Sequence, residues 1–194
     1  MINKDQLKIL YVDQKMSMND IAQTLGCSVN RVVYWMNKHE LSRRSISQAI
    51  YQKHNPDGDP FRLKPIKTRA DAELYGFGMG LYWGEGNKAN RHSVRLGNTD
   101  PALIRMFMRF LIKLCGVRQE KLRFSLQLFS DIEPTEALQF WLRELSVAAH
   151  QFYKPTVTIS GSIGTYRQKS RYGVITIYFH NKKLRDILVG SLPP

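Results

Sequence analysis

The chain has 194 residues, of which 29 are Lys or Arg and 16 are Asp or Glu, so its formal net charge at pH 7 is +13. A charge excess of this size predicts a polyanionic partner, most often nucleic acid, although a basic protein can also carry its charge without one. Hydrophobic residues make up 43% of the sequence, which predicts a globular protein with a packed core.

The sequence gives no sign of a membrane or secretory protein. Its longest apolar stretch, at 106–114, is interrupted by Arg109 and Lys113 and is too short and too charged to span a bilayer. The N-terminal MINKDQLKILY lacks the apolar region of a signal peptide. Cys27 and Cys115 lack metal-ligand spacing and are expected to be buried thiols in a reducing compartment. We therefore expect a cytoplasmic protein associated with the nucleoid.

Residues 1–54 are predicted to form a helical domain that contains a helix-turn-helix. A short helix is expected over 5–14, and two further helices within 17–40. Ser17 and Ser28 occupy N-cap positions, and Gly26 stands where the turn needs a left-handed residue. The side chains expected on the inner faces of these two helices are Ile21, Ala22, Leu25, Val29, Val32, Trp35 and Met36.

The second helix of a helix-turn-helix enters the major groove, where exposed residues near its N-terminus contact base edges. The candidate DNA-binding residues at this position are Ser28, Asn30, Arg31 and Tyr34. Asn and Arg can pair bidentately with adenine and guanine edges. Arg43 and Arg44 follow the helix and add positive charge. These features favour DNA over the alternative, a helical module that packs only against protein.

Residues 55–67 are predicted to be a basic linker. The segment HNPDGDP at 54–60 consists of turn-forming residues, so we place the domain boundary within 55–60. The basic residues that follow are Arg62, Lys64, Lys67 and Arg69. A basic tether of this kind would let one chain bind DNA at two places, which raises affinity through effective concentration. Residues 68–194 are expected to form the second domain.

The second domain is predicted to open with a helix that begins at Thr68 and ends at Gly86. Three glycines recur in it at every fourth residue and therefore share one face: Gly76, Gly80 and Gly84. Each costs up to about 1 kcal/mol relative to alanine, so this face is expected to allow close approach of another backbone. Glu85 lies at the C-terminal end, where the helix dipole opposes a carboxylate, and is therefore a candidate functional acid. Alternatively, Glu85 is simply solvated and the glycines face a bulky core of their own chain.

The rest of the second domain is predicted to be α+β. Strands are expected over 93–98, 121–129, 156–160 and 174–180, helices over 100–116, 134–145 and 181–188, and a glycine-rich loop over 161–171. The alternation along the strands predicts a twisted antiparallel sheet with helices over its apolar face and a cationic face left open. The side chains expected to meet DNA on that face or in the loop are Arg95, Arg123, Gln127, Thr158, Tyr178, Arg167, Lys169 and Arg171.

The segment GMGLYWGEG at 78–86 resembles the LAGLIDADG motif of homing endonucleases. Gly80 and Leu81 match the central glycine and leucine of the motif, and Glu85 and Gly86 match its closing acid and glycine. The segment RLGNTDPALIRMFMRFL at 95–111 is similar to the strand and helix that follow the motif in this family. The resemblance covers roughly residues 68–194.

The resemblance implies a fold, a partner and a chemistry. LAGLIDADG domains pair through their motif helices and lay a saddle-shaped sheet along the major groove, so a chain with one motif is expected to be a homodimer. Its interface would contain Gly76, Gly80 and Gly84. In this family the motif acids bind a divalent metal for strand cleavage, which implies Glu85 as a catalytic ligand of Mg²⁺ or another divalent cation. The candidate basic residues for the scissile phosphate are Lys88, Arg123 and Lys154.

The sequence also departs from the family pattern. Glu85 replaces the usual aspartate, one strand instead of two is expected between the motif and the next helix, and the helix at 134–145 is additional. Similar domains fused to helix-turn-helix units serve as transcription regulators that no longer cleave. Two hypotheses therefore stay open: a metal-dependent DNA endonuclease and a non-catalytic DNA-binding regulator.

Overall fold

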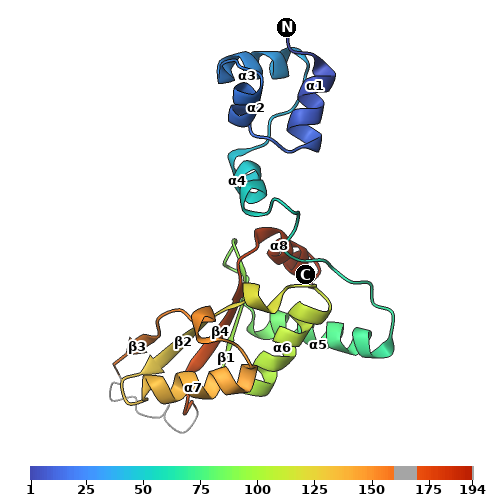
Figure 1. The fold of residues 1–194 in the computed structure, drawn as a ribbon. Helices are drawn as coiled ribbons and strands as arrows, with labels where there is room; N and C mark the ends of the chain where they lie inside the picture. Colours follow the sequence, from blue (N-terminus) through green and yellow to red (C-terminus); the bar gives the residue numbers. More distant parts are fainter. Residues whose placement is uncertain (160–169, 194) are drawn as a thin grey trace. The chain divides into compact units, whose positions relative to one another are not determined.

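The computed structural model describes residues 1–159 and 170–193, so Arg167 and Lys169 lie outside the described residues. The chain divides into two compact units, Met1–Asp59 and Pro60–Pro194. Together they contain α-helices and a four-stranded sheet, which confirms the predicted α+β class (Figure 1). Within the described residues, every helix is too short or too polar to cross a bilayer.

The first unit is helical. Its elements are α1 (Lys4–Lys8), the π-helix η1 (Ile9–Asp13), α2 (Met18–Thr24), α3 (Val29–Lys38) and α4 (Ile46–His54). Ser17 caps α2, and its hydroxyl accepts a hydrogen bond from the Asp20 amide, while Ser28 caps α3. Gly26 in the turn has a φ of 58°, as expected. Val29 is 37% exposed, so its predicted inward orientation is wrong.

The second unit follows the predicted order of elements. These are α5 (Arg69–Glu85), β1 (Val94–Asn98), α6 (Pro101–Lys113), η2 (Gln119–Lys121), β2 (Arg123–Phe129), α7 (Pro134–Leu145), η3 (Ala149–Gln151), β3 (Thr156–Thr158), β4 (Val174–Phe179) and α8 (Lys182–Gly190). The starts of the helices are set by side-chain caps: Thr68 and Asp71 form a capping box at α5, and Asp100 caps α6 ahead of Pro101.

The sheet has the strand order β1-β4-β2-β3. β4 pairs antiparallel with both β1 and β2, but β3 pairs parallel with β2. The prediction of an antiparallel sheet is therefore wrong at this edge. The reason is that α7 connects β2 to β3, and a crossover through a helix brings the chain back to start a strand in the same direction.

Helices α5, α6 and α7 lie over one face of this sheet (Figure 1). The sheet contributes apolar rows to the core, such as the fully buried Leu96, Ile177 and Phe124, which are neighbours on β1, β4 and β2. The helices contribute large side chains that include Phe107 of α6 and Trp141 of α7, both also fully buried. Within the described residues, α5, α6 and α7 leave the opposite face of the sheet uncovered (Figure 1).

Part of the predicted linker belongs to the second unit. Phe61 is buried in its core, the Arg62 amide donates to the Cys115 carbonyl at 2.9 Å, and the Lys64 amide donates to the Leu114 carbonyl at 2.8 Å. Gly116 has a φ of +65°, and a Cβ there would lie 2.4 Å from the Arg62 carbonyl oxygen. Glycine is therefore required at the point where this segment packs against the end of α6.

Candidate nucleic-acid interface

The helix-free face of the sheet carries polar and cationic side chains in rows across the strands. Residues directly opposite one another in paired strands point to the same face. Tyr178 of β4 pairs with Arg95 of β1 and with Arg123 of β2, so these three form one row. In other rows, Gln127 of β2 lies between Val174 and Thr156, and Thr158 lies beside Phe129. The structure thus brings together the sheet residues that the sequence predicts as DNA contacts.

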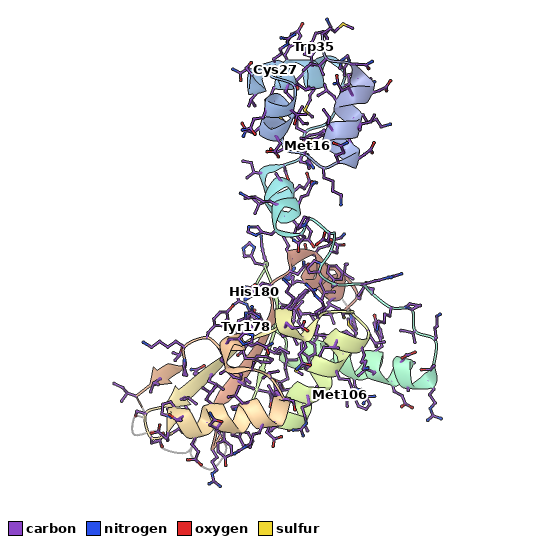
Figure 2. The ribbon with its side chains drawn as sticks, in the orientation of Figure 1. Met16, Cys27, Trp35, Met106, Tyr178 and His180 are labelled. Carbon is purple, nitrogen blue, oxygen red and sulfur yellow. The ribbon has the colours of Figure 1, made fainter. Side chains whose placement is uncertain are left out.

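Tyr178 is the centre of a cluster of aromatic and cationic side chains on this face. The Arg95 guanidinium carbon lies 5.0 Å from the centroid of the Tyr178 ring, and the Tyr178 hydroxyl is 2.9 Å from Ser125 Oγ. The His180 ring stacks beside it at 5.7 Å, and the Tyr153 ring meets it edge-on at 5.9 Å. Figure 2 shows Tyr178 and His180 next to each other at the end of β4.

Tyr153 and His180 are functional candidates that sequence reasoning missed. His180 is two residues beyond Tyr178, so strand alternation alone could have placed it on the same face. Tyr153 gives no such signal, because its position depends on the segment before β3 running along β2. The Tyr153 amide donates to the Phe124 carbonyl at 2.8 Å, and the Tyr153 hydroxyl lies 2.8 Å from His180 Nε2.

The electrostatics of the cluster are dominated by the positive charges of Arg95 and Arg123. Partial loss of hydration lowers the pKa of His180, whose side chain is still exposed, below its ordinary value of 6.5, and the positive charges of Arg95 and Arg123 lower it further. His180 is therefore neutral at pH 7. The lowered pKa of His180 also shows that the guanidinium groups of Arg95 and Arg123 both act on its imidazole ring.

Internal hydrogen bonds hold the two arginines in place. Arg95 Nε donates to Ser93 Oγ at 2.7 Å, and Arg123 Nη1 donates to the carbonyls of Glu120 and Leu122 at 2.7 and 2.9 Å. Both side chains are half-buried, whereas Lys154 is exposed. A fixed guanidinium loses less conformational entropy on binding an anion than a free one does.

In the first unit, the start of α3 presents an exposed polar surface. Ser28, Asn30, Arg31 and Tyr34 are all exposed, as the sequence predicts. Ser28 has a structural role as well, because its hydroxyl accepts a hydrogen bond from the Arg31 amide at 3.3 Å. Lys38 lies over the Trp35 ring at 5.0 Å and extends the cationic surface along the helix.

Arg43 and Arg44 differ in their surroundings, although the sequence treats them alike. Arg43 is exposed. The Arg44 guanidinium lies 3.9 Å over the Tyr11 ring and donates to the carbonyls of Lys15 and Met16 and to the side chain of Gln52. Because both Nη nitrogens donate to groups of the same unit, Arg44 has a structural role and is a weaker candidate for a DNA contact than Arg43.

The predicted glycine face of α5 is bare. Among the described residues, a Cβ built on Gly76, Gly80 or Gly84 would meet nothing within 4 Å outside the helix itself, so these glycines do not face a bulky core formed by that part of the chain. Phe77 and Trp83, three residues before and after Gly80, are 61% and 55% exposed. Residues three apart share a helix face, so the bare strip is flanked by exposed aromatic side chains.

A different glycine in α5 makes the close contact with the core. A Cβ on Gly78 would lie 2.2 Å from Cγ of Phe110 in α6. Gly78 is buried, and the sequence reasoning assigned it no packing role. Its position two residues from Gly80 places it on the opposite side of the helix.

Glu85 is the last residue of α5 and is exposed. The chain passes from it directly to the edge of the sheet, where Gly86 bridges to Leu96 and the Asn87 amide donates to the Arg95 carbonyl at 2.9 Å. Lys88 Nζ donates to the Trp83 carbonyl at 2.5 Å. Lys88 therefore caps the C-terminal end of α5, a structural role in addition to its predicted one.

The described residues of one chain do not form a complete metal centre. Among the described residues, no group of three or more His, Cys, Asp or Glu side chains is placed to hold an ion. Glu85 alone offers one carboxylate, whereas Mg²⁺ takes six oxygen ligands. Glu85 is therefore a single candidate ligand for the predicted Mg²⁺ among the described residues.

Comparison with protein-family models, with curated proteins and with solved structures finds no match to this chain.

Proposed function

We propose that this chain binds double-stranded DNA through both of its units. The observation that carries the proposal is the open face of the sheet, where Arg95 and Arg123 flank the aromatic Tyr178 in one row. Arginine is suited to phosphate and base-edge contacts, and a two-dimensional array of such side chains matches an extended polyanion better than a small ligand. The net charge of +13 supports a polyanionic partner.

The first unit is proposed to read DNA as a helix-turn-helix. In support, α2 and α3 are consecutive capped helices joined by a turn with Gly26 at positive φ. The exposed Asn30 and Arg31 lie in the first turn of α3, the part of a recognition helix that contacts base edges.

The second unit is proposed to be a LAGLIDADG-like domain that forms a homodimer through α5. The bare strip of Gly76, Gly80 and Gly84 and the exposed Phe77 and Trp83 support this arrangement, because close packing of a second α5 would remove apolar surface from water. The expected DNA site is then roughly two-fold symmetric.

Substitution on the sheet tests DNA binding. We compare wild type with a double variant, Arg95→Gln with Arg123→Gln, against a mixed-sequence duplex over a range of salt concentrations. The matched control is Arg109→Gln with Lys113→Gln, which removes the same charge from exposed positions on α6. The logarithm of the binding constant falls linearly with the logarithm of the salt concentration, and each lost phosphate contact makes this slope shallower by about 0.9. The slope of the sheet variant should therefore be shallower than that of wild type by about 2, and the slope of the control should change little. Equal losses in both variants would contradict the proposed surface.

DNA cleavage is a second candidate function, and the position of Glu85 favours it. Glu85 ends α5 beside the edge of the sheet, so pairing of two α5 helices would bring a second Glu85 nearby. The test incubates DNA with and without Mg²⁺, using wild type and Glu85→Gln. Metal-dependent cutting that Glu85→Gln abolishes supports an endonuclease. Binding without cutting leaves the alternative, a non-catalytic transcription regulator.

A further inference from the structure

Two positive side chains lie close together on the sheet and have no acidic partner among the described residues. Arg95 and Arg123 are separated by one strand, which corresponds to about 10 Å between their backbones. Within the described part of the chain, neither forms an ion pair, and their hydrogen bonds use only Nε of Arg95 and Nη1 of Arg123. The other guanidinium nitrogens keep their donors for a ligand.

His180 faces the same region from the end of β4. Groups from several elements surround it: Arg95 of β1, Arg123 of β2, Tyr178 of β4 itself, and Tyr153 from the segment before β3. Lys121 and Lys154 lie exposed in the neighbouring segments. The Tyr153 hydroxyl lies 2.8 Å from His180 Nε2, so this nitrogen of the imidazole is hydrogen-bonded within the protein. The surroundings of His180 thus contain cations and hydroxyl groups, and among the described residues no carboxylate contributes to its lowered pKa.

We propose that Arg95, Arg123 and His180 form a site for a backbone phosphate of nucleic acid, and that His180 takes up a proton as the phosphate binds. The proposal rests on the DNA-binding function above and identifies the group that the sheet binds. Two guanidinium groups supply fixed positive charge, and the histidine supplies a third donor once it is protonated.

Proton uptake follows from the charges around the histidine. In the free protein, the arginines oppose a positive charge on His180, which contributes to its lowered pKa. A phosphate between these groups neutralises that repulsion and adds an attraction, so it raises the pKa of His180. By linkage, DNA binding must then tighten as the pH falls through the range between the free and the bound pKa.

An NMR titration of His180 tests the site directly. The imidazole signals of the full-length protein are followed against pH alone, with inorganic phosphate, and with a mixed-sequence duplex, and His180→Gln identifies the His180 signal. We expect the pKa of His180 to rise by about one unit with either anion, which corresponds to about tenfold coupling.

Binding of the same duplex gives the second measurement. His180→Gln retains a polar partner for Tyr153 but does not titrate, so it should lose the gain in affinity that wild type shows as the pH falls. His92→Gln, at an exposed position outside the cluster, is the control and should keep the wild-type pH dependence.

The outcomes separate this proposal from DNA binding itself. If the duplex binds while the pKa of His180 stays constant, or if His180→Gln keeps the full pH dependence, the phosphate site is wrong and DNA binding stands. If inorganic phosphate raises the pKa but the duplex does not bind, the three residues bind phosphate but not the backbone of duplex DNA, and both the proposed ligand and the DNA function are wrong. If neither anion binds, both are wrong.

Discussion

His180 couples folding to pH in the absence of nucleic acid. Its pKa is lower in the folded protein than the ordinary value of 6.5 that it has in an unfolded chain, so between these two values the folded state binds fewer protons. The free energy of unfolding therefore contains a contribution that is complete above pH 6.5 and is lost as the pH falls through the folded pKa. In urea denaturation at several pH values, His180→Gln should reduce this loss. Equal pH dependence in His180→Gln and wild type would contradict the assignment.

Arg43 and Arg44 should separate binding from stability. Arg44→Gln removes charged donors from two backbone carbonyls and a contact over Tyr11, so we expect the first unit to lose about 1–3 kcal/mol of stability. Arg43→Gln changes an exposed side chain, and its effect on stability should stay within about 0.5 kcal/mol. Hydrogen exchange of residues 1–59 measures both effects. If the two variants lost equal protection, the structural role of Arg44 would be wrong.

The two cysteines should differ in reactivity. Burial raises the pKa of Cys115 to about 12, so it holds almost no thiolate at neutral pH. Cys27 is only half-buried, although the sequence predicted both thiols as buried. Iodoacetamide should therefore modify Cys27 in the folded protein and reach Cys115 only in urea, as read by peptide mass spectrometry. Modification of both at the same rate in the folded protein would contradict this.

At the scale of the element, α5 has glycines with opposite roles. Gly80→Ala fills open space and improves helix propensity, so it should raise monomer stability by up to about 1 kcal/mol. Gly78→Ala places a methyl group against Phe110 and should lower stability by about 1–3 kcal/mol. Thermal unfolding of the two variants at low protein concentration compares them. Loss of stability in Gly80→Ala would mean that its face is already occupied within the chain.

The sequence predicts most elements but not all of their partners. Caps such as Thr68 and Asp100 and the alternation along β2 are local signals, and they locate helices and strands closely. Whether β3 runs parallel or antiparallel depends on which strand it meets. The helix expected over 134–145 between two strands was the available signal for a parallel crossover. The position of Tyr153 in the site depends on the same pairing of this segment with β2, so the sequence did not predict it.

At the scale of the whole molecule, the proposed dimer makes a direct prediction. Gly80→Leu would place a large side chain in the bare strip and should prevent close packing of two α5 helices without disturbing the fold. Sedimentation should then give a dimer for wild type and a monomer for Gly80→Leu, with unchanged circular dichroism. A wild-type monomer, both free and on DNA, would contradict the interface.

The candidate site is also a property of the whole unit. The sequence identifies its cationic members Arg95 and Arg123 because strand alternation places them on the polar side. It does not show that they share a row with Tyr178, because that row joins three strands from distant parts of the sequence. Long-range pairing of this kind leaves no periodic pattern in a single sequence.

The strand order has a consequence for synthesis of the protein. β4 (Val174–Phe179) is the last strand in the sequence and pairs with both β1 and β2. While the ribosome is still translating the preceding residues, β1 and β2 have no common neighbour, and the apolar sides of β1, β2 and α6 lack their final cover. A nascent chain arrested before Val174 should therefore recruit chaperones that bind exposed apolar segments. Once β4 has left the ribosome and paired with β1 and β2, these chaperones should no longer bind.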